Sequence, residues 1–150
     1  MLSATTQRVS LNTDEAVNQQ IRRRTDANVV HYAAAGPRAI ERRLLELDYE
    51  WDVERLLETM APSITLTGLL LGVTVSRKWL VIPAVVQGFF LQHALQGWCP
   101  PIPVLRRLGV RTTDEINEER YALKAIRGDF RPAGALAETD PHDALEAARR

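Results

Sequence analysis

Apolar and charged positions divide the chain into a middle segment and two flanks. Between residues 60 and 103 the only charged residues are Arg77 and Lys78, and the flanks hold nearly all the remaining charge. The first apolar run, Met60–Ser76, would span roughly 25 Å as a helix. The second run, Trp79–Trp98, would span about 30 Å, the thickness of the hydrocarbon core of a bilayer. The pattern predicts an all-α fold with a two-helix transmembrane hairpin, whose first partner is the lipid bilayer.

The two basic residues mark the turn between these spans. One continuous helix would hold Arg77 and Lys78 near its middle at a cost of about 2.5–3.5 kcal/mol each, whereas a turn keeps both in interfacial water. Trp79 and Trp98 bracket the second span, and we expect them to anchor it at the two interfaces because an indole joins an apolar ring to an N–H donor. The alternative is a buried hairpin of a soluble protein, which should show a polar stripe. The only polar side chains of the first span are the hydroxyls of serine and threonine, which can bond their own helix carbonyls at i−4.

Basic residues near the spans predict the orientation. Two lie in the turn, and six lie on the side of the termini: Arg42, Arg43, Arg55, Arg106, Arg107 and Arg111. The positive-inside rule therefore places both termini in the cytoplasm.

A ridge of small residues follows one face of the first span, at Thr65, Gly68, Gly72 and Ser76. Glycines four apart let two helix backbones approach closely in lipid. The partner in this contact is either a second copy of the chain, which would give a homodimer, or the second span of the same chain.

The second span carries more polar side chains: Gln87, Gln92, His93 and Gln96. Such groups usually face protein and hydrogen-bond across helices. The alternative is a proton or ligand site at His93, but a single histidine without a nearby carboxylate makes a poor proton relay. We therefore expect His93 to hold helices together.

The second span stops at Trp98-Cys99-Pro100-Pro101. Prolines cannot continue a hydrogen-bonded helix, so a rigid polyproline-like turn is expected, after which Arg106 and Arg107 meet the lipid headgroups. Cys99 would lie at the water boundary, where Cys99 and His93 form the one candidate thiol site. No second cysteine or adjacent basic cluster lowers the pKa of this thiol, and two ligands are too few for a metal site.

The same stretch, residues 97–116, resembles the Gly-x-Cys-Pro…Leu-Gly-(Ile/Val)-x-Thr signature of the YgaP-like inner-membrane transmembrane domain family, a bacterial family largely without assigned function. The matching positions are Gly97, Cys99, Pro100, Leu108, Gly109, Val110 and Thr112. The resemblance covers about residues 55–113 and implies a multi-pass protein of the bacterial inner membrane with two short transmembrane helices. The namesake joins this domain to a rhodanese; these residues contain no rhodanese segment, so no sulfurtransferase activity is expected. The insertion of residues 101–103 and the long helical flanks depart from the pattern.

Helical periodicity continues in the flanks. A helix is predicted over 36–59, opened by Gly36-Pro37, with an apolar stripe at Ile40, Leu44, Leu47 and Trp51. Its acidic face disfavours anionic lipid, so packing within a dimer or against residues 113–127 is expected.

The C-terminal flank predicts a second cytoplasmic helix over 104–130. Thr112 and Glu115 have capping-box spacing, Ile116, Leu123 and Ile126 share a face, and Gly128 is a stop signal. Residues 131–150 are assigned to a tail, and residues 1–35 to a polar segment that is weakly helical or disordered.

Composition argues against several kinds of partner and site. Lys plus Arg and Asp plus Glu number 19 each, so the net charge is zero and nucleic acid is not an expected partner. One cysteine cannot form an internal disulfide. No catalytic, metal or cofactor constellation appears. The sequence favours a non-enzymatic membrane anchor that presents cytoplasmic helices for self-association or for an unknown protein partner. The alternatives are an auxiliary of sulfur or thiol chemistry through Cys99 and a soluble α-helical interaction module.

Overall fold

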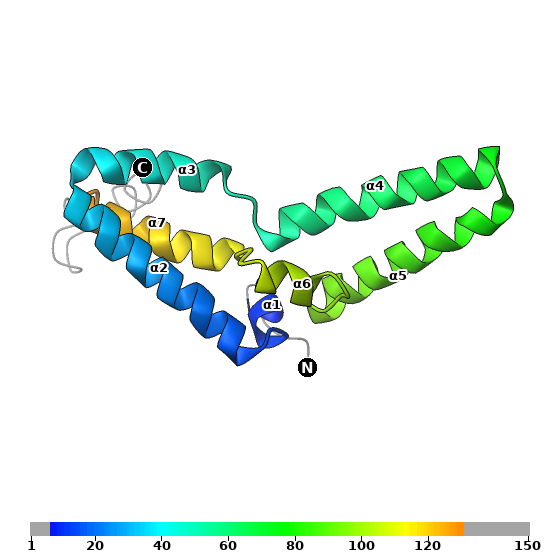
Figure 1. Cartoon of the computed structure of the whole chain (residues 1–150), viewed down its shortest axis with the longest axis horizontal. Coiled ribbons are helices and arrows are strands. Elements are labelled where there is room, and N and C mark those ends of the chain that lie inside the picture. The colour runs from blue at the N-terminus through cyan, green and yellow to red at the C-terminus, as the bar shows by residue number, and fades with distance from the viewer. Residues whose placement is uncertain (1–6, 131–150) are drawn as a thin grey trace, which may run out of the picture. The chain divides into compact units, whose positions relative to one another are not determined.

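The computed structural model describes residues 7–130, which form helices and contain no strand, so the all-α prediction is confirmed. In chain order the elements are α1 (Arg8–Leu11), α2 (Glu15–Ala35), α3 (Pro37–Tyr49), α4 (Val53–Thr74), the 3-10 helix η1 (Arg77–Leu80), α5 (Val81–Gln96), α6 (Ile102–Arg107) and α7 (Thr113–Arg127) (Figure 1). The predicted tail at 131–150 lies outside the described residues.

The chain divides into two compact units. Within the described residues, the first unit comprises 7–23 and 51–115, and the second unit comprises 24–50 and 116–130. Helix α2 begins in the first unit and ends in the second. The polar segment expected to be weakly helical or disordered therefore contains a helix of 21 residues.

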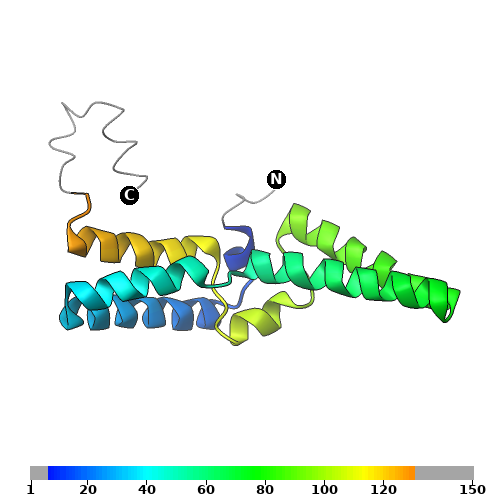
Figure 2. The ribbon, with the colours of Figure 1, turned by 90° about the horizontal axis from the view of Figure 1, so that it is seen from above.

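The second unit packs its helices around one apolar cluster. Ile40, Leu44 and Leu47 of α3 pack with Ile116 and Leu123 of α7, and α2, α3 and α7 lie side by side in both views (Figures 1 and 2). Of the two alternatives left open for the 36–59 segment, its α3 part takes the second and packs against residues 113–127. Ile126, predicted on the same face of α7, is half exposed instead.

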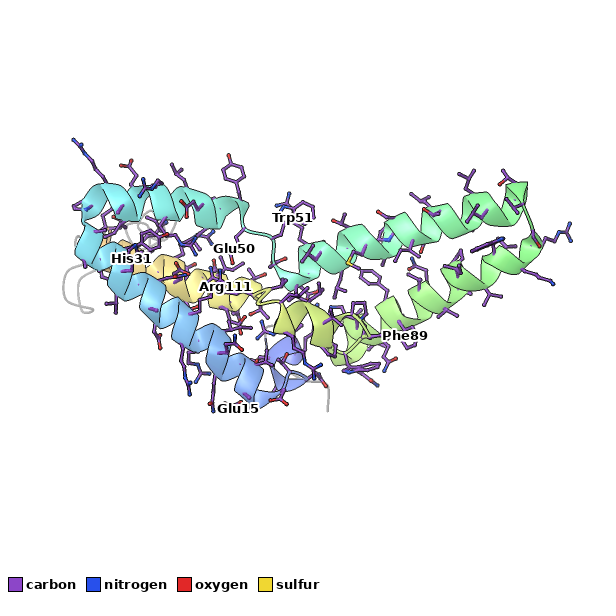
Figure 3. The ribbon with its side chains drawn as sticks, in the orientation of Figure 1. Glu15, His31, Glu50, Trp51, Phe89 and Arg111 are labelled. Carbon is purple, nitrogen blue, oxygen red and sulfur yellow. The ribbon has the colours of Figure 1, made fainter. Side chains whose placement is uncertain are left out.

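The helix predicted over 36–59 is broken at Glu50-Trp51-Asp52. The backbone of Glu50 is extended, and the side chain of Asp52 accepts a 2.7 Å hydrogen bond from the backbone N–H of Arg55, which caps α4. An aspartate cap satisfies a free amide of the first turn and so favours a new helix start. Trp51 lies on the connection between the helices and is 43% exposed, so it leaves the buried stripe (Figure 3).

In the first unit, α4 and α5 lie side by side and antiparallel (Figures 1 and 2). The turn between them holds Ser76 and η1. Pro83 falls in the first turn of α5, where its missing N–H costs little. The base of the pair packs with α1 and α6 through the core residues Val9, Val53, Leu57, Cys99 and Ile102.

One helical stretch of the described residues is long and apolar enough to cross a membrane. It is Pro37–Thr74, which contains α3 and α4 and whose most apolar part is mostly exposed. Helix α5 has 16 residues, about 24 Å, which is short for a bilayer. A second membrane-length helix is therefore not found.

The proline-rich stop differs from the prediction. Pro101 has helical backbone angles and caps α6, and Pro103 lies in the first turn of that helix. No polyproline-like turn forms, because a proline in the first helical turn lacks only an N–H that has no intrahelical partner.

Candidate functional site

The small-residue ridge faces the second apolar helix of the same chain. Gln87 donates a 2.8 Å hydrogen bond from Nε2 to Thr65 Oγ1. A Cβ added at Gly68 would lie 2.6 Å from Pro83 Cδ, and one added at Gly72 would collide with Leu80.

Ser76, at the end of the ridge, caps η1 by accepting from the backbone N–H of Lys78. Of the two interpretations that the sequence left open, the structure shows packing within one chain. A homodimer through this ridge would have to displace α5.

Hydroxyls elsewhere on α4 bond the helix itself. Ser63, Thr67 and Thr74 each donate to the carbonyl four residues earlier, at 2.7–2.8 Å. This confirms the expected use of these groups, which satisfies them without water.

The tryptophans at the two ends of the second run differ in environment. Trp79, in η1, is 41% exposed. Trp98 is half-buried, and its ring meets the edge of Phe89 with centroids 6.5 Å apart. Trp79 is therefore the more exposed of these two tryptophans, and Trp98 packs against α5.

His93 is the buried member of a polar cluster at the base of the α4–α5 pair, which we call the base cluster: Arg8, Glu54 and His93. The imidazole is 2% exposed, and its Nε2 lies 2.8 Å from Glu54 Oε2. Arg8 donates to the other oxygen of Glu54 at 2.9 Å and to the carbonyl of Ala94 at 3.2 Å. The cluster therefore ties α1, α4 and α5 together.

The absence of a carboxylate near His93, assumed from the sequence, is wrong. The hydrogen bond with His93 and the contact with Arg8 hold the pKa of Glu54 below its ordinary value, although burial opposes the shift. Glu54 was missed because it is 39 residues from His93. The available signal was its spacing with Leu57 and Ala61, which puts one acid on the buried face of α4.

Cys99 does not sit at a water boundary. It is 3% exposed within the apolar core, and burial raises the pKa of its thiol. Between Cys99 and His93, both in the described part of the chain, there is no hydrogen bond. A buried thiol with a raised pKa is a weak nucleophile, so the geometry gives no support to a thiol site here. Among residues 7–130, no group of three metal-ligating side chains occurs either.

Arg106 was expected at the lipid headgroups, and this is wrong. Its side chain is buried and makes two 2.6 Å hydrogen bonds with the carboxylate of Glu115, plus a 2.9 Å bond with Asn18. A buried arginine is stable only beside a carboxylate partner of this kind. Arg111 is also buried, so two of the six basic residues in the orientation count are internal, while Arg107 is exposed.

The Glu115 carboxylate also completes the predicted capping box. It accepts 2.8 Å from the Thr112 N–H, and the Glu115 N–H lies 3.4 Å from the Thr112 hydroxyl. Burial would raise the pKa of Glu115, but the bonds from Arg106 and Thr112 outweigh it and lower that pKa.

Comparison of the chain with models of known protein families, with curated proteins and with solved structures gives no match. The resemblance of residues 97–116 to the YgaP-like family stays a prediction from its motif. Several motif positions lie at helix ends or turns in this structure. Gly97 ends α5 with φ of 75°, Gly109 has φ of 84°, and Thr112 caps α7.

Proposed function

We propose that this protein is a non-enzymatic anchor of the bacterial inner membrane. In this proposal α4 and α5 cross the bilayer as a hairpin, and the second unit lies in the cytoplasm, where its helices bind a protein partner or a second copy. The bacterial membrane follows from the motif resemblance, and the anchoring follows from the surface of α4 and α5.

The observation that carries the proposal is the apolar belt, a set of exposed side chains on α4, η1 and α5: Leu66, Leu69, Leu70, Val73, Leu80, Val81, Val85, Leu91 and Leu95. Val73 is 84% exposed and Leu66 is 66% exposed. A soluble monomer rarely exposes so continuous an apolar surface without a partner. Hydrocarbon would cover the belt at no cost in lost hydrogen bonds, because the hydroxyls of α4 are already paired.

Helix α5 alone is short for a bilayer crossing, and η1 extends it. Residues 77–96 run without interruption from η1 into α5. In the proposed arrangement Arg77 and Lys78 remain in water at the turn, and Trp79 anchors that interface.

Carbonate extraction tests the anchor. We expect the full chain, expressed in bacteria, to stay in the membrane pellet at high pH and to require detergent for release. Recovery in the supernatant would contradict the proposal and would favour the soluble interaction module.

Orientation needs a separate test, because the exposed basic residues near the spans are now Arg42, Arg55 and Arg107 against Arg77 and Lys78. In a Cys99→Ala background, a cysteine replacing Ser76 should react with an impermeant maleimide in cells whose outer membrane alone has been permeabilised. A cysteine replacing Ser10 is the control and should react only after lysis. The reverse pattern would overturn the cytoplasmic termini.

A further inference from the structure

A lateral pocket of about 250 Å³ lies between α4, α5 and the turn that follows α5. Ala61 and Ile64 line it from α4, Phe89 and Phe90 from α5, and Cys99 closes it (Phe89 is labelled in Figure 3). Its other lining residues are also apolar. A polar ligand would lose its hydrogen bonds to water there without replacement, so the pocket selects for hydrocarbon.

The walls of this pocket are held by the rest of the fold. Leu57 and Cys99 belong to the buried core of the first unit. The Phe90 ring stacks on His93 with centroids 6.4 Å apart, and Glu54 holds that imidazole. A pocket whose walls are already ordered binds a ligand without the entropic cost of fixing its side chains.

Small size at one position keeps the pocket open. Ala61 is nearly buried on the inner face of α4, at 8% exposure, and is a lining residue. A larger apolar side chain at this position would fill the space, as core positions normally do. The alanine at this position leaves the pocket unfilled by the protein and open to a ligand.

The rim of the pocket opens onto apolar surface. Met60, Ile64 and Phe89 line the pocket and are also 37–43% exposed. Met60 comes two residues after Glu58, the last charged residue of α4. In the proposed membrane arrangement, the rim therefore lies where headgroups give way to acyl chains, and hydrocarbon is the medium beside it.

We propose that the lateral pocket holds part of one acyl chain of a bilayer phospholipid, whose headgroup stays outside at the cytoplasmic interface. This inference rests on the proposed function, since it takes the belt to face lipid. The volume fits part of a chain: a cavity of about 150 Å³ lined by similar side chains takes up a benzene ring, and this pocket is larger.

Photo-crosslinking tests the inference with the full chain in liposomes of phosphatidylethanolamine and phosphatidylglycerol. A small fraction of the phosphatidylethanolamine carries a diazirine near the carboxyl end of one acyl chain. After irradiation and digestion with chymotrypsin, which cleaves between Leu91 and Cys99, mass spectrometry measures lipid attached to the peptide containing Cys99 and to the peptides containing Leu70 and Leu91. In the wild type we expect labelling of all three.

Ala61→Phe should reduce labelling of the Cys99 peptide roughly tenfold, the change that about 1.4 kcal/mol of lost binding produces. Ala61→Val should reduce it less, and labelling of the Leu70 and Leu91 peptides should stay the same. Ala84→Phe is the matched control, because Ala84 is exposed on α5 and does not line the pocket. It should leave all labelling unchanged.

The outcomes separate this inference from the anchor. Labelled belt peptides with an unlabelled Cys99 peptide in the wild type would overturn the acyl-chain site and leave the anchor standing, as when a second copy fills the pocket. Cys99 labelling that persists in Ala61→Phe would also overturn the site. If Ala61→Phe loses helical circular dichroism, Ala61→Val decides in its place. Unlabelled belt peptides in the wild type would overturn the anchor and the site together.

Discussion

Two helix–helix contacts of this protein are built in opposite ways. Between α3 and α7 of the second unit, large apolar side chains such as Leu44 and Leu123 face inward. Between α4 and α5 of the first unit, glycines and a Thr65–Gln87 hydrogen bond face inward, and leucines and valines face outward. In water the hydrophobic effect drives leucine into the contact. In lipid it does not, and helices associate through close approach and hydrogen bonds.

Charge distinguishes the second unit from the apolar belt, although the base of the first unit also buries an ion pair, Arg106–Glu115. The second unit buries an ion pair: Arg43 Nε lies 2.7 Å from Oε1 of Glu119, which is fully buried, and Arg43 also contacts Glu46 at 3.1 Å. Burial alone would lower the pKa of Arg43, but these carboxylates outweigh it and raise the pKa. The apolar belt contains no charge. The contrast therefore predicts that the same substitution will have different effects in the two units.

The largest effect is expected at the buried ion pair. Glu119→Ala leaves Arg43 without its closest carboxylate, and removal of one partner of such a pair costs about 3–5 kcal/mol. Hydrogen exchange of α3 and α7 amides in mild detergent should show this loss. Glu118→Ala, an exposed neighbour, is the control and should change protection by less than about 0.5 kcal/mol. Equal effects of the two variants would contradict the importance of the pair.

The next effect distinguishes the media that surround the two units. Leu70→Arg introduces a charge into the belt and should reduce membrane insertion by about 2.5–3.5 kcal/mol, measured as the inserted fraction in a translocon assay. Leu45→Arg makes the same exchange at an exposed position of α3. It should alter insertion and stability by no more than about 0.5 kcal/mol. Unchanged insertion of Leu70→Arg would mean that water surrounds the belt.

A smaller effect tests the close approach of α4 and α5. Gly68→Ala should destabilise the pair by about 1–3 kcal/mol, because the added methyl group meets Pro83 and Ile82. Gly88→Ala has open space at its Cβ and should stabilise α5 by about 0.5–1 kcal/mol through helix propensity. Thermal unfolding in detergent, followed by circular dichroism, measures both. Opposite signs support the contact, and a shared sign contradicts it.

The smallest expected effect is the pH dependence of the base cluster. The pKa of Glu54 is lower in the folded protein than its ordinary 4.5, chiefly because of its hydrogen bond with His93. Its contribution to stability is therefore complete above that ordinary value and is lost as pH falls through the folded-state pKa.

Exchange protection of α1 and α5 amides, measured from about pH 6 to about pH 3, should fall over the acidic end of this range. Glu54→Gln should flatten the fall, and Glu58→Gln, exposed on the same helix, should leave it unchanged. An identical profile for Glu54→Gln and the wild type would exclude the cluster as its source.

Local signals were enough for several elements. Gly36-Pro37 predicted the start of α3, and Thr112 with Glu115 formed the expected capping box. These features depend on neighbours within four residues. The break at Asp52 was missed, because the apolar stripe continues through it and hides a helix cap.

What the sequence by itself determined is the helical class, the uncharged middle of the chain and the small-residue ridge, since each follows from residue type and spacing. Only the tertiary structure decided that the ridge contacts α5, that Arg106 is buried against Glu115, and that Arg8 and Glu54 meet His93. The physical reason is that burial and pairing depend on which distant segments meet. A buried charge is stable only beside its partner, and the periodicity of a single helix does not identify that partner.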